Sequence, residues 1–456
     1  MSSRRLVGCA IVLAAIWSAQ PASLGAQTPR GATVFEGARL IVGDGSATIE
    51  NSVFVVEQGR FTQVGRRGEV QVPAGAARVD LTGKTVIPAL VDGHSHIGYQ
   101  KGVSTSVKNY TRENILDHMY RFAYYGISAS QAMGSDFGDM PYELKRDILA
   151  GKYPDAARFL TAGRGLAPFS EIDKDNMRHA AYVVLTEEGA RAEVRELASR
   201  GVTLVKTWVR ADPKMSPELY GALIDEAHRN NVRVAVHATV PADAKGLLRA
   251  GIDVFAHMLD DVDDEMVALF KQHPNAVVLP SLAAPRLGTG YAPWLDPLDP
   301  LLAVTQPADH IKLFRDRVAS ATPAARKRGM EAWDRQAKGV MKLYAAGVKL
   351  GLGTDGGGQN GGYVGWTAHA ELENLVAAGL TPMQVITIAT KNTAEILRID
   401  ELGTVSPGKS ADFDVLDANP LENITNSRKI SRVYLRGHEV DRARLAAMWK
   451  SGGYTN

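Results

Sequence analysis

Between residues 85 and 398, short apolar runs that end in polar residues alternate with stretches whose apolar residues recur at helical spacing. Such runs are typical of buried strands, and the stretches between them are typical of amphipathic helices. The predicted strands are 86–91, 126–129, 159–162, 204–208, 233–236, 254–256, 277–279 and 349–352. Repeated alternation of a strand with a helix predicts an α/β fold of the (β/α)₈ barrel type, as in the TIM barrel.

The pattern changes on both sides of this region. Residues 27–84 contain short runs of β-branched and aromatic residues separated by turn signals, and they show no helical period. Residues 399–456 return to strand-like runs at 412–416 and 432–436, before a short C-terminal helix. We predict that 27–84 and 399–456 form one small discontinuous β-sandwich beside a catalytic barrel at 85–398.

The N-terminus has the pattern of an export signal. Arg4 and Arg5 precede an apolar stretch at 6–17, and Leu24-Gly25-Ala26 offers a cleavage site with small residues at 25 and 26. The predicted signal peptide is 1–26, so we expect the protein in the periplasm or secreted. The apolar stretch is too short to span a bilayer, and we expect no membrane contact of the mature form.

Composition and charge narrow the class of protein. The chain has 456 residues, of which 45% are hydrophobic and 22% are charged, and its formal net charge is +2. These values are typical of a soluble globular protein and give no reason to expect a nucleic acid partner. The only cysteine, Cys9, lies in the predicted signal peptide, so we expect neither a disulfide nor a thiol nucleophile in the mature chain.

Ionisable side chains gather where the predicted strands end. His94 and His96 are two positions apart, so they should point to the same side of the first strand. Four more such residues belong to later strands: Lys206 lies within the fourth, and His237, His257 and Asp355 follow the ends of the fifth, sixth and eighth. The carboxyl ends of barrel strands meet at one face, and burying so many ionisable groups there without metal would be costly. The pattern therefore predicts a metal site.

Another motif indicates no function. Residues 403–410 fit the phosphate-loop pattern G-x-x-x-x-G-K-S. A phosphate loop lies between a strand and a helix, because the helix amides bind the phosphate. Here the following residues, 411–416, have the pattern of a strand, so we do not predict a nucleotide site.

The residues described so far carry a resemblance to a known family. The segment Pro88-Ala89-Leu90-Val91-Asp92-Gly93-His94-Ser95-His96, the triplet Gly353-Thr354-Asp355 and the C-terminal segment 403–412 are similar to motifs of the amidohydrolase superfamily, on the branch with imidazolonepropionase-like and prolidase-like enzymes. The resemblance covers nearly the whole mature chain. One departure is Ala256-His257-Met258, where relatives often carry Glu-His-Gly. The departure alters the pocket, so the substrate cannot be carried over from relatives.

The resemblance implies a role for each residue at the strand ends. His94, His96 and Asp355 would bind the more buried metal ion, and His237 and His257 would bind a second. Lys206 matches the lysine that is carboxylated by carbon dioxide in binuclear members and bridges both ions. The expected cofactors are two divalent metal ions, with zinc preferred, and an N6-carboxylysine at position 206. A single-metal enzyme with unmodified Lys206 is the alternative.

The resulting hypothesis is metal-assisted hydrolysis of a C–N bond in a small molecule, an amide, small peptide or N-acyl amino acid. Asp355 would be the catalytic general base and acid. The same site could serve a lactonase, carboxylesterase or phosphotriesterase, and a non-catalytic binding protein on this fold is a further alternative. Relatives often assemble, so a homo-oligomer remains open.

Substrate contacts are predicted only in outline. Arg210, His369 and Tyr99 are candidate substrate-binding residues because of their positions after predicted strands. The longest connection, at 281–304, is rich in Pro, Gly and Leu. It could be a lid over the catalytic face or a surface excursion.

Overall fold

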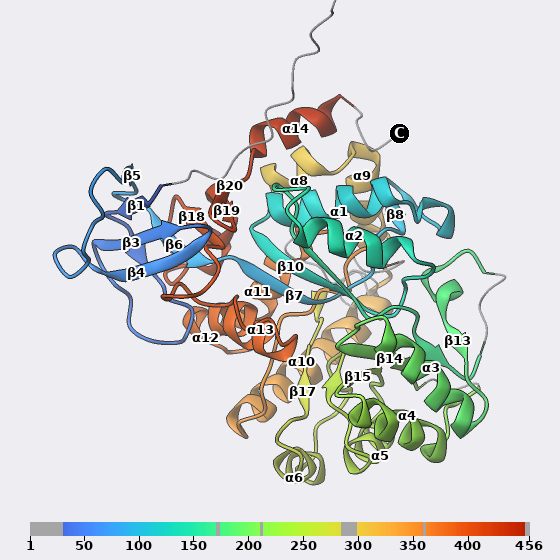
Figure 1. Cartoon of the computed structure of the whole chain (residues 1–456). Helices are drawn as coiled ribbons and strands as arrows, with labels where there is room; N and C mark the ends of the chain where they lie inside the picture. Colours follow the sequence, from blue (N-terminus) through green and yellow to red (C-terminus); the bar gives the residue numbers. More distant parts are fainter. Residues whose placement is uncertain (1–30, 170–173, 210–212, 284–298, 359–361, 452–456) are drawn as a thin grey trace, which may run out of the picture.

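The computed structural model describes residues 31–169, 174–209, 213–283, 299–358 and 362–451. Figure 1 shows a small sheet-rich part on the left, made from both ends of the chain, and a larger α/β part on the right. The predicted signal peptide at 1–26 lies outside the described residues. Among the described residues, no helix combines the length and apolar character of a membrane span.

The larger part is built on two parallel sheets. One has the strand order β11-β10-β7, and the other has the order β13-β12-β14-β15-β16-β17. The bounds are β7 (Leu90–Ser95), β10 (Ile127–Ala132), β11 (Arg158–Thr161), β12 (Leu166–Ala167), β13 (Tyr182–Val183), β14 (Leu204–Trp208), β15 (Arg233–His237), β16 (Val254–Phe255) and β17 (Val277–Val278).

Residues 349–356 join these two sheets. On one side, the Gly351 amide donates to the Val278 carbonyl oxygen of β17 at 3.0 Å. On the other, the Gly93 amide of β7 donates to the Leu352 carbonyl oxygen at 2.9 Å. The predicted eighth strand thus occupies its expected place, although it contributes isolated bridges instead of a regular strand. Within the described residues the fold is a mixed α/β arrangement of the TIM-barrel type without a closed ring of strands.

The prediction of one strand over 86–91 is wrong in one respect. The run contains two strands that belong to different sheets. Thr85–Pro88 (β6) pairs antiparallel with Phe413–Leu416 (β18), whereas β7 begins at Leu90 and pairs with β10. Both halves are apolar because both are buried, so the change of sheet leaves no mark on the hydrophobic pattern.

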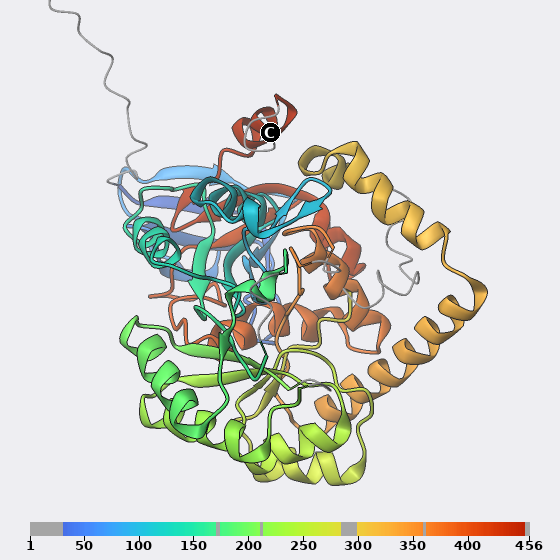
Figure 2. The ribbon, with the colours of Figure 1, turned by 90° about the vertical axis from the view of Figure 1, so that its right-hand side faces the viewer.

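Helices surround the strands of the larger part (Figure 2). They start where the sequence supplies caps: at α4 the Ser216 side chain accepts the Leu219 amide and Pro217 occupies the first turn. The helices are α1 (Arg112–Tyr124), α2 (Met140–Leu149), α3 (Glu187–Ser199), α4 (Pro217–Arg229), α5 (Pro241–Arg249), α6 (Asp264–Gln272), α8 (Pro300–Thr305), α9 (Ala308–Ala319), α10 (Pro323–Ala345), α11 (Thr367–Ala377), α12 (Pro382–Thr387), α13 (Thr393–Ile396) and α14 (Arg442–Lys450).

Short elements complete the chain path. A two-stranded hairpin, β8 (Gln100–Lys101) with β9 (Ser104–Thr105), follows the strand of the metal-site histidines. The single turns are η1 (Val107–Asn109), η2 (Met177–Ala180), η4 (Ile388–Asn392) and η5 (Ile424–Arg428).

The small part consists of two sheets that pack face to face. One sheet has the order β4-β3-β1-β5, and the other has the order β2-β6-β18-β19-β20. Their bounds are β1 (Thr33–Glu36), β2 (Arg39–Leu40), β3 (Ser52–Glu57), β4 (Arg60–Arg66), β5 (Ala77–Asp80), β19 (Ile430–Leu435) and β20 (His438–Glu439). Phe35 and Phe54 stack on each other at 5.0 Å, and Phe413 meets both edge-on. Both ends of the chain therefore share one aromatic core.

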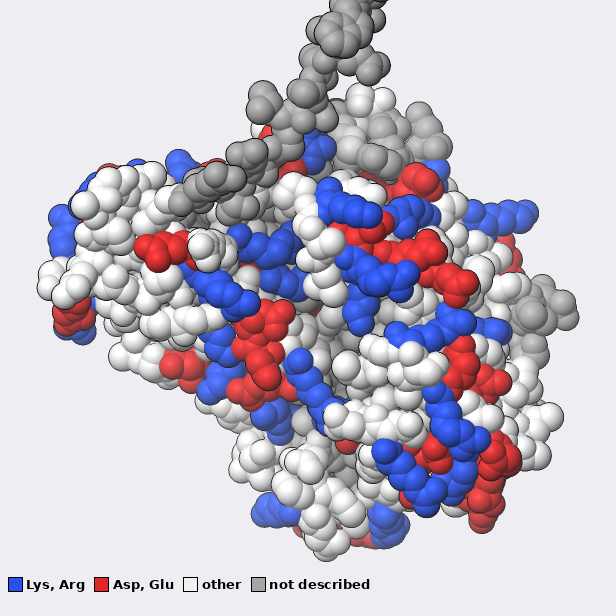
Figure 3. Space-filling view, viewed as in Figure 1, with Lys and Arg blue, Asp and Glu red and all other residues white. Residues whose placement is uncertain are grey.

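Two buried contacts tie the C-terminal segment to the larger part. Arg158 of β11 pairs with Asp412 at 2.7 Å and also donates to Ser410 Oγ at 2.9 Å. In α14, Trp449 Nε1 donates to Asp117 Oδ1 of α1 at 2.7 Å. On the face drawn in Figure 3, basic and acidic side chains are interspersed without a large area of one sign, as expected for a net charge of +2.

Candidate metal centre

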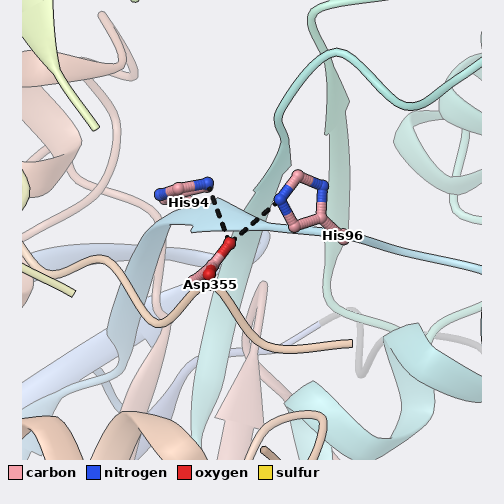
Figure 4. A group of neighbouring side chains, drawn as sticks. All are labelled: His94, His96 and Asp355. Carbon is pink, nitrogen blue, oxygen red and sulfur yellow. Dashed lines mark ion pairs between the residues drawn. The ribbon is translucent and has the colours of Figure 1, made fainter. Parts of the chain in front are cut away.

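Three predicted ligands converge at the carboxyl end of β7 (Figure 4). Asp355 Oδ1 lies 3.4 Å from His94 Nε2 and 3.0 Å from His96 Nε2. One ligand atom from each of the three residues lies within 4.8 Å of the other two. Both histidines are buried, and the Asp355 side chain is 21% exposed. This spacing and chemistry fit one divalent ion with nitrogen and oxygen ligands.

The backbone places Asp355 against β7. The amides of Thr354 and Asp355 both donate to the His94 carbonyl oxygen, at 3.0 and 2.9 Å. Asp355 has a φ of +53°, in the left-handed region that residues other than glycine seldom occupy. Such conformations persist where surrounding contacts enforce them, and they cluster at functional sites.

The orientation of the His94 ring is set by one hydrogen bond. Its Nδ1 lies 2.8 Å from the Ala256 carbonyl oxygen, and since a carbonyl only accepts, Nδ1 carries the proton. The lone pair is then on Nε2, which is buried and has no hydrogen-bond partner among the described residues. Burial lowers the pKa of His94 well below its ordinary value. A neutral imidazole with a free lone pair is the form that binds metal.

His257 and His237 extend this group of imidazoles. The His257 ring centroid lies 4.9 Å from that of His94 and 4.4 Å from that of His237. Burial lowers the pKa of His257 well below the usual range and lowers that of His237 to about 4. Both rings are therefore neutral at neutral pH and close enough to form a second ligand group.

Lys206 lies in β14, fully buried, and its Nζ has no hydrogen-bond partner among the described residues. Burial lowers the pKa of Lys206 to about 7, against the opposing effect of the Asp355 charge. Two glycines, Gly134 and Gly165, leave room for the side chains of β14. A Cβ on Gly134 would lie 2.7 Å from Lys206 Cβ, and a Cβ on Gly165 would lie 2.1 Å from the Trp208 ring.

Asp92 is a buried residue beside the candidate ligands to which the sequence analysis gave no role. Its Oδ1 accepts the His94 amide at 3.1 Å, and its Oδ2 accepts the Thr354 hydroxyl at 2.7 Å. The carboxyl group thus connects the His94 strand to the segment of Asp355. Burial raises its pKa to about 7. Its position two residues before His94, on the same face of β7, was the available signal.

Two predicted substrate contacts require correction. The Tyr99 hydroxyl donates to the Ser135 carbonyl oxygen at 2.6 Å, and the ring is fully buried. His369 is buried in α11, with its ring nitrogens 2.9 Å from Ser427 Oγ and 3.0 Å from the Tyr125 carbonyl oxygen. Both polar groups are used inside the protein core, so neither side chain offers one to a substrate.

Other predicted substrate elements lie outside the described residues. These are Arg210 and most of the connection at 281–304, of which 284–298 are not described.

Comparison with known proteins places the chain in a family. The model of the Amidohydrolase family matches residues 85–440. The structure of a putative prolidase from Bifidobacterium longum superposes with a TM-score of 0.73 and 26% identity, over 92% of this chain and 99% of that one. The structure of a Xaa-Pro dipeptidase with bound methionine gives a TM-score of 0.71 and 23% identity, over 90% and 99%.

Curated relatives match at lower or more local similarity. The imidazolonepropionase of Cereibacter sphaeroides is 24% identical over 407 residues, 82% of this chain and 90% of that protein. An uncharacterized protein of Mycobacterium tuberculosis is 28% identical over 216 residues, 45% of this chain, and the match spans about half (53%) of that protein's length. The family match over most of the chain confirms the resemblance: this protein belongs to the amidohydrolase family.

Proposed function

We propose that the protein is an exported metal-dependent hydrolase that cleaves a C–N bond in a small molecule, an amide, a small peptide or an N-acyl amino acid. The observation that carries the proposal is the convergence of the buried imidazoles of His94 and His96 on Asp355. Within the described part of the chain, His94 Nε2 and Lys206 Nζ are buried and have no hydrogen-bond partner. A buried polar atom without a partner is costly, and metal coordination would compensate this cost.

The residues fit two divalent ions. His94, His96 and Asp355 would hold one ion, and His237 and His257 the other. Lys206 would bridge them as a carbamate, because a pKa of about 7 leaves much of its amine neutral, and the neutral amine is the form that reacts with carbon dioxide. The nitrogen and oxygen donor set without thiolate favours zinc among common biological metals.

Bound zinc would polarise a carbonyl group and lower the pKa of a water molecule. Asp355 would take the proton of the attacking water and return it to the leaving amine. Although burial alone would raise it, contacts with His96 and the neighbouring histidines hold the pKa of Asp355 well below its usual value. Asp355 is therefore ionised, which is the form that both a metal ligand and a general base require.

The names of similar proteins support a C–N bond as the target. Solved structures that share this fold include a Xaa-Pro dipeptidase and a phenylurea hydrolase. A curated relative of similar length is the 5-methylthioadenosine/S-adenosylhomocysteine deaminase of Symbiobacterium thermophilum. These names describe hydrolysis at carbon–nitrogen bonds in small molecules.

A substrate panel tests the proposal. Purified, zinc-loaded protein is assayed with dipeptides, N-acyl amino acids, a lactone and a phosphotriester, beside Asp355→Asn. We expect turnover of at least one dipeptide or N-acyl amino acid, and a loss of at least 10²-fold in the variant. Turnover of only the lactone or phosphotriester would contradict C–N hydrolysis. Equal behaviour of wild type and variant across the panel would indicate a binding protein.

The state of Lys206 is tested by reconstitution. Metal-free protein is loaded with zinc with and without ¹³C-bicarbonate, and zinc content is measured by mass spectrometry. With bicarbonate, we expect two zinc ions per chain and a ¹³C NMR signal from the carbamate carbon. Without bicarbonate, we expect fewer zinc ions per chain. Lys206→Met should bind fewer ions under both conditions, while the surface variant Lys312→Met should match wild type. A full complement of zinc in Lys206→Met would refute the bridging role.

A further inference from the structure

Ser281, just after β17, adopts a strained backbone conformation beside the metal centre. It is fully buried and has a φ of +51°. This left-handed region suits glycine, and a residue with a Cβ occupies it at a cost. Some contact in the fold must therefore hold the chain in this conformation.

Glu371 of α11 supplies that contact. It is fully buried, and its two carboxylate oxygens accept the amides of Leu282 and Ala283 at 2.9 and 2.8 Å. A carboxylate that binds two consecutive amides fixes the orientation of both peptide planes. These planes directly follow Ser281, so Glu371 sets the direction in which the chain leaves that residue.

The strained conformation brings the Ser281 hydroxyl to the ligand histidine. Its Oγ lies 3.4 Å from His94 Nδ1 and 3.3 Å from the Ala256 carbonyl oxygen. The same carbonyl accepts the His94 Nδ1 proton at 2.8 Å. On the other side, a Cβ on Gly353 would lie only 2.8 Å from Oγ. The hydroxyl thus lies beside the hydrogen bond between His94 Nδ1 and the Ala256 carbonyl oxygen, which fixes the His94 ring.

We propose that Glu371 and Ser281 form a positioning pair for the metal centre. Glu371 holds the left-handed backbone of Ser281. Ser281 in turn stabilises the hydrogen bond that His94 Nδ1 donates to the Ala256 carbonyl oxygen, so that Nε2 faces the metal position. The inference rests on the proposed function in that it takes His94 as a metal ligand. Neither residue of the pair touches the reacting atoms, and each acts through His94.

Zinc affinity gives the first test. Glu371→Gln replaces one acceptor oxygen with an amide group that cannot accept the amide of Leu282 or Ala283. We expect zinc binding, measured by chelator competition, to weaken at least ten-fold. Glu373→Gln is the matched control, since it removes a carboxylate from the same helix that pairs with Arg428, and it should stay within two-fold of wild type. Equal affinities of Glu371→Gln and wild type would overturn the proposal.

Glycine at position 281 gives the second test, because glycine adopts the left-handed conformation without a contact to hold it. Ser281→Gly should weaken zinc binding about as much as Glu371→Gln does, because it removes the hydroxyl that lies beside His94. In that background, Glu371→Gln should cause less than a three-fold further loss. A full ten-fold loss in the double variant would show that Glu371 does not act through the backbone of Ser281.

A third readout uses the metal-free protein. In protein labelled with ¹⁵N-histidine, wild-type His94 should give the signals of a single tautomer with the proton on Nδ1. Ser281→Ala, which also serves if Glu371→Gln does not fold, should show a second tautomer or faster exchange of that proton with water. Unchanged His94 signals in Ser281→Ala and in Glu371→Gln would refute the positioning role of the pair. Failure of the wild type to bind zinc would instead refute the proposed function, because the tautomer measurement needs no metal.

Discussion

At the scale of single residues, the absence of a side chain matters as much as its presence. Gly134 has a φ of +76°, and a Cβ there would lie 2.7 and 2.8 Å from the Cβ and Cγ of Lys206. The lysine stem therefore runs against bare backbone. This space determines where Nζ lies, and so whether it can reach both groups of imidazoles.

Substituting Gly134 should displace Lys206. Gly134→Ala is expected to lower the free energy of unfolding by about 1–3 kcal/mol, the usual cost of overpacking, and to reduce zinc content toward one ion. Gly138→Ala is the matched control: its φ is +72°, so it has a similar backbone cost, but a Cβ there would meet nothing within 4 Å. Urea unfolding and metal analysis measure both effects. Equal losses in the two variants would show that crowding at Lys206 is unimportant.

Residue contacts also explain why parts of the site escaped prediction. The grouping of His94, His96 and Asp355 could be predicted because ionisable residues at strand ends form a pattern along the chain. Tyr99 and His369 were misassigned because their partners, the Ser135 and Tyr125 carbonyl oxygens, come from other segments. Glu371 was not recognised because its role depends on two backbone amides, which no sequence pattern displays.

At the scale of elements, a buried ion pair joins the two parts of the molecule. Arg158 of β11 and Asp412, just before β18, are both almost fully buried. Burial raises the pKa of Asp412, but contacts with charged and polar neighbours, above all the Arg158 charge, more than offset this effect and keep the pKa below its ordinary value. The pair lies where the small part meets the larger one, and its removal should affect the whole fold.

Breaking one side of this pair should be costly. Arg158→Met is expected to lower the free energy of unfolding by about 3–5 kcal/mol, because it leaves a buried charge uncompensated. Arg158→Met with Asp412→Leu should recover most of the loss, since both charges are then absent. Urea unfolding at neutral pH measures the difference. A double variant no more stable than Arg158→Met would indicate that packing, and not charge, is lost.

His118 of α1 predicts a pH dependence of folding. Its Nδ1 accepts the Gly98 amide at 3.0 Å, and its Nε2 donates to the Gln100 carbonyl oxygen at 2.8 Å, so the neutral ring is fully used. Burial lowers its pKa from 6.5 to about 4. Between these values the unfolded chain binds a proton that the folded chain does not, so stability falls as the pH falls, by about 1.4 kcal/mol per pH unit.

The measurement is urea unfolding of metal-free protein between pH 4 and pH 7. His118→Asn should be less stable at pH 7 and should lose less stability per pH unit below 6.5 than wild type. His228→Asn, which removes an imidazole that is 44% exposed in its side chain, controls for the loss of a histidine. A slope in His118→Asn as steep as that of wild type would rule out the assignment.

Element boundaries show what the hydrophobic pattern could and could not predict. Strands and helices of the larger part follow from apolar runs and helical spacing, as at α4, where Leu219, Leu223 and Ala227 are buried. The change from β6 to β7 could not be predicted, because strand partners are chosen by contacts with residues near 127 and 413. Segment 349–352 was expected as a regular strand. Its irregular form could not be predicted for a similar reason, since its bridges depend on both neighbouring sheets.

At the scale of the whole molecule, the surface agrees with a small-molecule enzyme. Charges of both signs alternate on the face shown in Figure 3, and no single-sign stripe of the kind that binds nucleic acid is seen there. Buried ionisable groups with shifted pKa values, His94, His237 and Asp355 among them, lie around the ends of the parallel strands, where proteins of the TIM-barrel type have their active sites.

The continuity of β6 with β7 also constrains the order of events during synthesis. β6 lies between β2 and β18, and β18 is synthesised much later than β6. Until β18 is made, the edge of β6 that will pair with β18 has no partner. A growing chain with an unpaired strand edge is prone to aggregation. The His94 strand begins two residues after β6, so it becomes firmly anchored only once the C-terminal strands have paired. Metal loading is therefore expected to follow completion of the polypeptide, not to guide its folding.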